Sequence, residues 1–190
     1  KKIEYFYGDI RDRNSVIKAV KGGHKVVNLA SLIAIPYSYE APFSYIETNI
    51  VGTTNLLQVS LEQKIKKFVQ ISTSEVYGSA IKIPMSENHP LNAQSPYAAT
   101  KIGADQMALS FHKSFNLPVV VIRPFNTFGP RQSERAIIPT IIAQAMKKNS
   151  INIGSVFPKR DFTYVSDTCE GIIKALNNNI KNIFGQTINL

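Results

Sequence analysis

The chain has 190 residues, of which 44% are apolar, which is enough to enclose one substantial hydrophobic core. No apolar run approaches the roughly 18 residues that a membrane-spanning helix needs, so we expect no membrane span. The formal charge of +9 suits a basic surface or an anionic partner, but no cluster of basic and aromatic residues favours a nucleic acid. The single cysteine, Cys169, excludes an intrachain disulfide and fits a reducing cytoplasm.

The pattern of apolar residues predicts strands and helices in alternation. Strands are expected at 2–8, 25–30, 67–72, 117–124, 160–165 and 186–190, and helices at 14–20, 49–63, 96–115, 137–148 and 166–177. We expect Asn14 or Ser15 to cap the first helix. Runs such as "KVVNLA" and "LPVVVIRP" are almost continuously apolar, which is typical of strands buried on both faces.

This alternation predicts an α/β fold, with a doubly wound parallel sheet and helices on both of its faces. Three stretches that we expect to be irregular, 31–47, 72–94 and 123–136, each follow a buried strand. Ligands bind at the carboxyl ends of the strands in such sheets, so these stretches are where we expect the chemistry.

The sequence "SPYAATK" places Tyr97 and Lys101 four residues apart, on one face of a helix that Ser95 can cap. A free tyrosine has a pKa of about 10, and a nearby ammonium and the helix N-terminus both favour the phenolate. The pair can therefore serve as a general base. The same spacing also arises by chance, and an aromatic ring packed against a lysine stem is the structural alternative.

The sequence "STSEVYG" ends the preceding buried strand in hydroxyl residues, followed by a carboxylate. Thr73 can hydrogen-bond a phenolate, and Glu75 can act as an acid or a base. The alternatives are turn capping by Thr73 and Ser74 and a solvated carboxylate at Glu75.

Seven motifs occur in a fixed order along the chain: "GDIRD", "NLAS", "TNIVGTTNLL", "STSEVYG", "YAATK", "RPFNTFGPRQ" and "RDFTYVSD". Together they resemble the extended short-chain dehydrogenases/reductases that act on nucleotide sugars. The resemblance implies a partial Rossmann-like fold, with an NAD-binding domain at 1–126, part of a substrate-binding lobe at 127–161, and a helix and strand returning to the first domain at 162–190. The family's G-x-x-G-x-x-G loop does not occur here, so the resemblance implies that the chain lacks the first strand, first helix and second strand of the family's fold, and also its C-terminal end.

Within this family the resemblance implies a nucleotide-sugar 4,6-dehydratase. Tyr97 would take the proton of the 4-hydroxyl during hydride transfer, and Lys101 would hold the nicotinamide ribose. Thr73 would hydrogen-bond the phenolate, and Glu75 would remove the C5 proton. The sequence Thr-Ser-Glu matches GDP-mannose 4,6-dehydratases, whereas many glucose-type enzymes have Thr-Asp-Glu. Either Glu75 or Ser74, through a water molecule, could protonate the departing hydroxyl.

Two further readings of the motifs remain open. Epimerases usually carry no carboxylate after this strand, so Glu75 disfavours a 4-epimerase, but a 4-epimerase or a decarboxylase of the same family stays an alternative. A non-catalytic nucleotide-binding fragment is another. The motifs "SLIAIPYSYEAP" and "SPYAATKIGADQ" resemble dehydratases of the legionaminic-acid pathway, which implies a nucleotide-linked N-acetylglucosamine as substrate.

The resemblance also implies ligand contacts. The implied cofactor contacts are Asp9, Ile10, Leu29, Ala30, Ser31, Asn49, Ser72, Tyr97 and Lys101. The implied substrate contacts are Thr73, Ser74, Asn126, Arg131 and Arg160. These residues also have structural alternatives. Asp9 and Ile10 would suit a strand-ending turn, and Leu29, Ala30 and Ser31 would suit tight packing. Asn49 could be an N-cap, and Arg131 and Arg160 could be ordinary surface charges. NAD is the expected cofactor, and NADP remains an alternative because the segment that distinguishes them is absent.

The resemblance further implies a homodimer formed by the helices at 49–63 and 96–115. His24, His89 and His112 are not clustered, and no metal-ligand spacing occurs, so we expect no metal. We expect a nucleotide-sugar partner and neither a nucleic acid nor a membrane.

Overall fold

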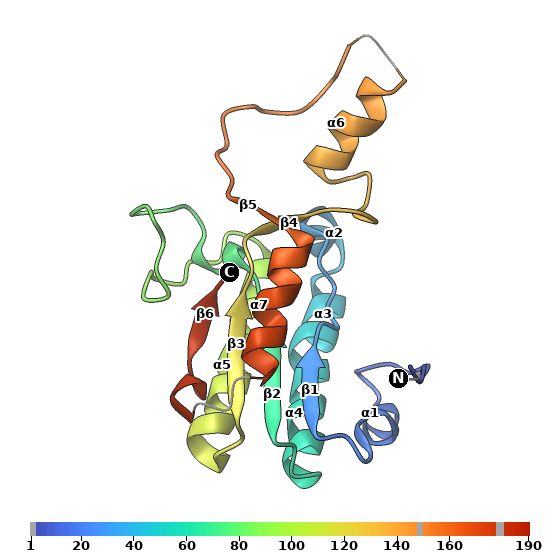
Figure 1. Cartoon of the computed structure of the whole chain (residues 1–190), viewed down its shortest axis with the longest axis vertical. Coiled ribbons are helices and arrows are strands. Elements are labelled where there is room, and N and C mark those ends of the chain that lie inside the picture. Colours follow the sequence, from blue (N-terminus) through green and yellow to red (C-terminus); the bar gives the residue numbers. More distant parts are fainter. Residues whose placement is uncertain (1–2, 148–149, 178–180) are drawn as a thin grey trace.

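The computed structural model describes residues 3–147, 150–177 and 181–190 of the chain (Figure 1). Its strands are β1 (Lys25–Asn28), β2 (Lys67–Ile71), β3 (Val119–Arg123), β4 (Asn126–Phe128), β5 (Phe162–Tyr164) and β6 (Thr187–Asn189). Its α-helices are α1 (Arg13–Val20), α2 (Ile35–Glu40), α3 (Pro42–Tyr45), α4 (Thr53–Glu62), α5 (Pro96–Phe115), α6 (Ile137–Ala145) and α7 (Val165–Asn177). The π-helical segment is η1 (Ile46–Gly52), and the 3-10 turns are η2 (Ser74–Tyr77) and η3 (Lys181–Ile183).

The main sheet contains four parallel strands in the order β1-β2-β3-β6. Val27 pairs with Val69, and Val69 with Val120, so the central strands place apolar residues in register across the sheet. Because side chains alternate along a strand, each strand supplies both faces of the sheet. The predicted parallel α/β fold is confirmed.

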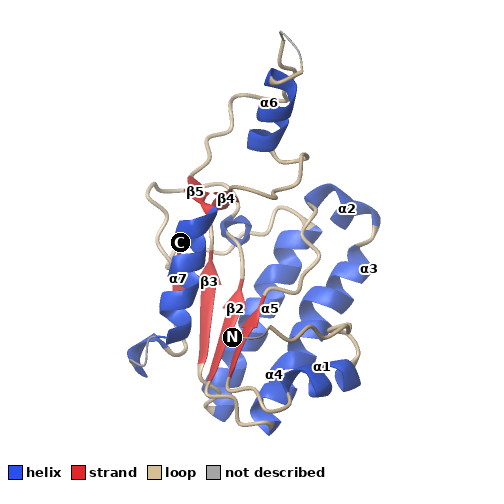
Figure 2. Cartoon of the chain, turned by 45° about the vertical axis from the view of Figure 1, so that its right-hand side comes forward, coloured by secondary structure: helices blue, strands red, loops and turns tan. Residues whose placement is uncertain are grey.

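Helices cover both faces of this sheet (Figure 2). On one face, Phe68 and Val121 pack with Leu57 of α4 and with Ala108 and Phe111 of α5. The opposite face carries a second apolar cluster, in which Val69, Val120 and Ile122 pack against Ala175 of α7. The continuous apolar runs of the sequence thus reflect strands that are buried from both sides.

The N-terminal residues differ from the prediction. The strand expected at 2–8 is absent from the described residues 3–8, where the side chains of Tyr5 and Tyr7 are 90% and 103% exposed. No described strand lies beside this segment, so its backbone has no ladder partner and its apolar residues have no layer to cover them. The cap of α1 also differs, because Asp12 and not Asn14 or Ser15 accepts the free backbone N–H groups of the first turn.

The stretch at 31–47 is more ordered than expected, because it contains α2 and α3. Tyr45 is fully buried, and its hydroxyl donates to the carbonyl oxygen of Ala34, 2.5 Å away, which ties the two short helices together. The next helix begins at Ile46 as η1 and continues as α4, so it starts three residues before the predicted position 49. A buried aromatic anchor of this kind leaves no periodic signal in the sequence.

Beyond the main sheet, β4 and β5 pair in parallel and α6 stands at the end of an extended excursion (Figure 1). The helix predicted at 137–148 is present up to Ala145, and its last predicted residue lies outside the described residues. The proposed domain boundaries near 126 and 161 fall beside this small sheet and stay a prediction.

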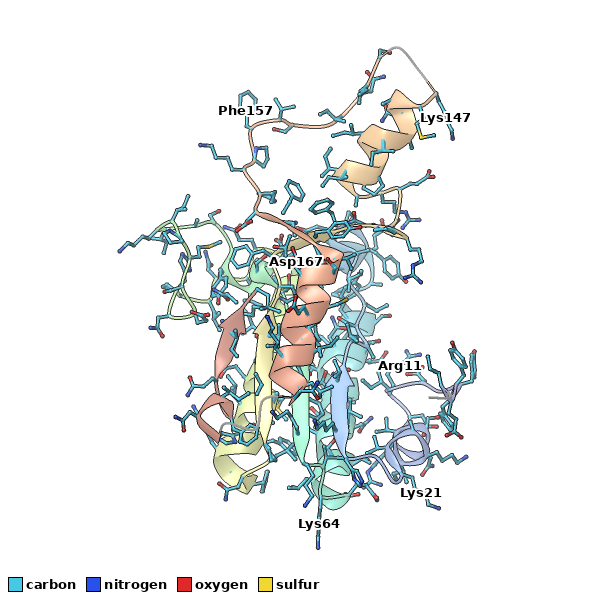
Figure 3. The ribbon with its side chains drawn as sticks, in the orientation of Figure 1. Arg11, Lys21, Lys64, Lys147, Phe157 and Asp167 are labelled. Carbon is cyan, nitrogen blue, oxygen red and sulfur yellow. The ribbon has the colours of Figure 1, made fainter. Side chains whose placement is uncertain are left out.

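Two of the basic side chains lie far from the carboxyl ends of the strands. Figure 3 shows Lys21 and Lys64 at the opposite end of the sheet from Asp167, on the turns before β1 and β2. This part of the positive charge is therefore ordinary solvated charge at element ends.

Candidate active site

The N-terminus of α5 lies beside the carboxyl end of β2. Ser95 caps this helix as predicted, because its hydroxyl oxygen accepts the backbone N–H of Ala98 at 3.1 Å, and Pro96 follows at the first position. The helix then buries Tyr97 and Lys101, whose side chains are 7% and 4% exposed.

The structure brings Thr73, Glu75 and Tyr97 together. Burial raises the pKa of Tyr97 to about 12, a hydrogen bond with the Thr73 side chain acts to lower it, and the nearby Glu75 carboxylate raises it further. Tyr45 packs edge-on against the Tyr97 ring, with 6.3 Å between ring centroids, and contributes to its burial. Tyr97 therefore holds its proton at neutral pH in this arrangement.

Lys101 does not lower the pKa of Tyr97 in the way that the sequence suggested. Its ammonium donates instead to the carbonyl oxygen of Ile71, 2.7 Å away at the end of β2. Burial lowers the pKa of Lys101 to about 8, against the opposing charge of Asp105. In this arrangement burial dominates the ionisation of both groups, while the backbone carbonyl orients the ammonium.

A buried chain of polar contacts runs beneath this pair. The Asp105 carboxylate accepts a hydrogen bond from Ser72 Oγ at 2.8 Å and from Arg123 Nε at 3.1 Å, and all of these side chains are buried. Arg123 also donates to the Tyr77 hydroxyl at 3.0 Å, and that hydroxyl donates to Asn189 Oδ1 at 2.7 Å. We call Ser72, Asp105, Arg123, Tyr77 and Asn189 the polar chain. It joins α5 to η2, β3 and β6, and to Ser72 just beyond the end of β2.

Burial raises the pKa of the Asp105 carboxyl, whereas the charge of Arg123 and the hydrogen bond from Ser72 oppose that rise. We take the carboxylate form as the state that matches the geometry, because Arg123 approaches Asp105 Oδ2 through two of its nitrogens. The hydroxyl of Ser72 is therefore committed to a carboxylate within the protein core.

The sequence analysis did not single out Asp105, Tyr77, Arg123 or Asn189 as site residues. One signal was available: Tyr97, Lys101 and Asp105 are spaced four residues apart and so share one face of α5. Another was Arg123 in an otherwise apolar strand, since an arginine seldom occupies such a position without a charged partner.

A cleft of about 700 Å³ opens at the carboxyl ends of β2, β3 and β6. Four predicted site residues, Ser74, Glu75, Asn126 and Arg160, are among those that line it. Arg131 is not among them; it is exposed and lies in a turn with a left-handed backbone at φ +69°. Of the five predicted substrate contacts, the cleft lining thus contains Ser74, Asn126 and Arg160 but neither Thr73 nor Arg131.

A second cavity, of about 480 Å³, lies along β1. Four predicted cofactor contacts line it: Asp9, Ile10, Leu29 and Ala30. The carboxylate of Asp9 is held by Arg11 through the backbone N–H and the guanidinium, and these hydrogen bonds lower the pKa of Asp9.

Asn49 does not open a helix, because it lies inside η1 and is 1% exposed. Its amide oxygen accepts from the Leu32 N–H at 2.8 Å and lies 3.0 Å from the hydroxyl of Ser31. Its amide nitrogen donates to Thr100 Oγ1 on α5 at 3.0 Å. In this structure Asn49 therefore fixes the loop after β1 to α5, and Ser31 is drawn into the same contact.

The described residues contain no group of three or more His, Cys, Asp or Glu side chains arranged to hold a metal ion. Within the same residues, every helix is too short or too polar to cross a membrane.

The family model for GDP-mannose 4,6 dehydratase matches residues 1–188. The chain is 34% identical over 176 residues to a dTDP-glucose 4,6-dehydratase of Actinoplanes sp., covering 92% of this chain and 55% of that protein. It therefore spans about half the length of the curated relatives that it matches.

Two solved structures show the same arrangement of elements. DesIV, a dTDP-glucose 4,6-dehydratase from Streptomyces venezuelae solved with NAD bound, superposes with a TM-score of 0.88 at 30% identity, covering 96% of this chain and 56% of that one. A UDP-glucuronic acid 4-epimerase from Bacillus cereus, solved with UDP-glucuronic acid and NAD, also gives a TM-score of 0.88, at 33% identity with 96% and 58% coverage. Since the family model spans nearly the whole sequence, the chain belongs to the GDP-mannose 4,6-dehydratase family of nucleotide-sugar enzymes.

Proposed function

We propose that the protein is an NAD-dependent nucleotide-sugar 4,6-dehydratase. The observation that carries the proposal is Glu75, which lines the cleft and lies close enough to Tyr97 for its charge to raise the pKa of the phenol. Dehydration needs a second acid/base group beside the one that serves C4 oxidation, and Glu75 is placed to supply it.

The second cavity has room for part of the cofactor. Its volume lies within the roughly 300–1,000 Å³ typical of small-molecule sites, and Ile10 and Leu29 offer apolar faces to a planar ring. Ala30 is small enough to allow close approach. NAD, when bound, would accept the hydride from C4 and return it to C6.

The residues of the chain would share the proton transfers. Tyr97 must lose its proton to act on the 4-hydroxyl, and a pKa of about 12 means that positive charge must first offset its burial. Lys101 supplies such a charge one helical turn away if its ammonium turns from the Ile71 carbonyl toward the phenol. Glu75 would then take the C5 proton, which a 4-ketone makes acidic, while Thr73 orients the phenol.

The substrate would enter the cleft with its diphosphate toward Arg160. The guanidinium of Arg160 is exposed and donates only to the neighbouring carbonyl of Lys159 among its described contacts, so it is available for a phosphate fork. Asn126, on the same side of the cleft, would hydrogen-bond the sugar or its phosphates. The motifs that resemble legionaminic-pathway enzymes favour a nucleotide-linked N-acetylglucosamine as the sugar.

The test is the variant Glu75→Gln in the complete natural protein, assayed with UDP-N-acetylglucosamine, GDP-mannose and dTDP-glucose. We expect formation of the 4-keto-6-deoxy product to fall by about 100-fold or more, because the amide cannot accept the C5 proton. Glu134→Gln, a change at an exposed glutamate outside the cleft lining, is the matched control and should leave the rate unchanged. Wild-type rates in Glu75→Gln would contradict the assignment of this glutamate.

The B. cereus structure keeps a 4-epimerase as the second candidate, because its fold similarity equals that of the dehydratase. Mass spectrometry of the product separates the two. A dehydratase yields a sugar lighter by one water, whereas an epimerase leaves the mass unchanged. A calorimetric titration with NAD tests the remaining alternative, a nucleotide-binding protein without catalysis.

A further inference from the structure

Residues 79–92 form one wall of the large cleft, and we call them the cleft wall. Ser79, Ala80, Ile83, Pro84 and Met85 are among the cleft-lining residues. The segment has no helix or strand, and it projects beside the end of β6 as the green loop of Figure 1. Its Ile81 and Ile83 are 78% and 79% exposed, so apolar packing holds these two side chains only weakly.

The neck of the cleft wall is closed by hydrogen bonds. The Asn92 N–H donates to the Val76 carbonyl at 2.9 Å, and Gln94 Nε2 donates to Ser79 Oγ at 3.0 Å. Gly78, at φ +65°, makes the turn into the wall, and a Cβ there would collide with the Asn92 carbonyl oxygen. These contacts hold the two ends of the cleft wall together. They do not hold the residues on its far side, between those ends.

Two residues hold that far side. His89, in the wall itself, is 8% exposed, packs edge-on against Tyr77 and accepts the Ile81 N–H at 3.0 Å, and Asn189 of β6 makes the contacts to the main sheet. The backbone N–H of Asn189 donates to Glu87 Oε1 at 3.0 Å, and its side-chain amide donates to the Met85 carbonyl at 3.2 Å. The side-chain oxygen of Asn189 accepts from the Tyr77 hydroxyl at 2.7 Å. Asn189 therefore binds the wall with two donors and the polar chain with its acceptor.

Through the polar chain, the wall is connected to the catalytic helix. Tyr77 contacts Arg123, and Arg123 pairs with Asp105, which lies on α5 eight residues after Tyr97. The wall of the cleft and the helix that carries the acid/base pair are thus anchored to the same buried contacts.

From these contacts we infer that Asn189 and Glu87 are positioning residues that latch the cleft wall in the conformation that receives the sugar of the substrate. The inference rests on the proposed nucleotide-sugar activity and adds a role that acts through the wall and not on the reacting atoms. Loss of the latch weakens substrate binding and leaves the chemical step of bound substrate unchanged.

The experiment compares Glu87→Ala, Glu87→Gln and Asn189→Asp in the complete protein. Glutamine keeps the oxygen that accepts from the Asn189 N–H, whereas alanine removes it. Asn189→Asp keeps the acceptor for Tyr77 and replaces the donor to Met85 with a second oxygen. Hydrogen–deuterium exchange of 79–92 and the kinetics with the nucleotide sugar are both measured, and a melting curve confirms that each variant is folded.

We expect Glu87→Ala and Asn189→Asp to speed exchange of the wall and to raise the substrate KM by about fivefold, the usual effect of one lost hydrogen bond. The kcat should stay within about twofold, since the groups that transfer protons are untouched. Glu87→Gln should behave as wild type in both measurements. If the wall needed a negative charge at this position instead of a hydrogen-bond acceptor, Glu87→Gln would behave like Glu87→Ala.

Unchanged exchange in the two disruptive variants would overturn the latch, and so would faster exchange with an unchanged KM. If Asn189→Asp does not fold, the comparison of Glu87→Ala with Glu87→Gln decides whether the latch exists. If the wild-type protein converts no nucleotide sugar, the proposed function fails, and the exchange data alone then support or reject the latch.

Discussion

At the scale of single residues, burial governs the two groups that carry the proposed chemistry. The pKa of Tyr97 rises to about 12 and that of Lys101 falls to about 8, so both groups favour their uncharged forms more than they would in water. Under the proposed function, bound substrate and cofactor would therefore have to change the surroundings of Tyr97 before it could lose its proton.

These shifts predict a pH dependence of stability. Between pH 8 and about 10.5, Lys101 loses its proton in the folded protein but keeps it in the unfolded chain, so its contribution to stability rises with pH. Over this interval the free energy of unfolding of wild type should gain on the order of 3 kcal/mol relative to Lys101→Met. Urea titrations of both proteins at pH 7.5, 9 and 10 would measure the gain.

Tyr97 acts in the opposite direction at higher pH. Its folded pKa of about 12 exceeds the ordinary value of 10, so the stability that it contributes is complete below pH 10 and is lost as pH rises toward 12.

The Lys101 prediction has a clear contrary outcome. If the stability of wild type and of Lys101→Met changed in parallel from pH 7.5 to 10, Lys101 would not be buried as described.

At the scale of elements, α5 connects the site to the core. Its N-terminal turn presents Tyr97, its middle carries Asp105 of the polar chain, and its C-terminal half packs Ala108 and Phe111 against the sheet. A change at the start of this helix should therefore affect stability and catalysis together.

Ser95→Ala tests this dependence. Loss of the side-chain cap should lower the free energy of unfolding by about 1 kcal/mol, whereas Ser95→Asp keeps an oxygen for the Ala98 N–H and should preserve it. Thermal and urea denaturation measure both effects. Equal stability of alanine and aspartate variants would show that the cap does not hold this turn.

The elements also show what could be inferred from sequence alone. The helix at 96–115 and its cap were predicted correctly, because Ser-Pro followed by good helix formers is a strong local signal. The prediction of a strand at 2–8 was wrong, because a strand needs a neighbouring strand to pair with. The sequence of the segment itself does not show whether such a neighbour is present. The polar chain could not be predicted, because its members come from four elements and meet only through the sheet order.

Part of the candidate site could likewise be predicted from the sequence, and part could not. Thr73, Glu75 and Tyr97 were placed together by motif order, and the structure brings them together at the end of β2. The contacts of Asn49 and Lys101 could not be predicted from the sequence, because each is decided by which backbone carbonyl or N–H group lies beside it. Such contacts are properties of the fold and not of any short segment.

At the scale of the whole molecule, we propose a homodimer through η1, α4 and α5. Two apolar side chains of η1, Ile46 and Val51, are 41% and 46% exposed and so are available for such a contact. Val51→Glu should therefore shift the protein from dimer to monomer in light scattering, because it would bury a charge at the contact. Lys64→Glu, at the far end of the sheet, serves as the control (Figure 3). A monomeric wild type would rule out this assembly.

The position of Asn189 has a consequence for how the protein is made. The latch joins residues 102 positions apart in the chain, and its strand is the last one described. On the ribosome, the chain emerges from its N-terminus, so the residues of α5 appear long before β6, which carries Asn189. The nascent chain can therefore build its central strands first, and the cleft cannot take the shape that it has in this structure before β6 docks beside β3.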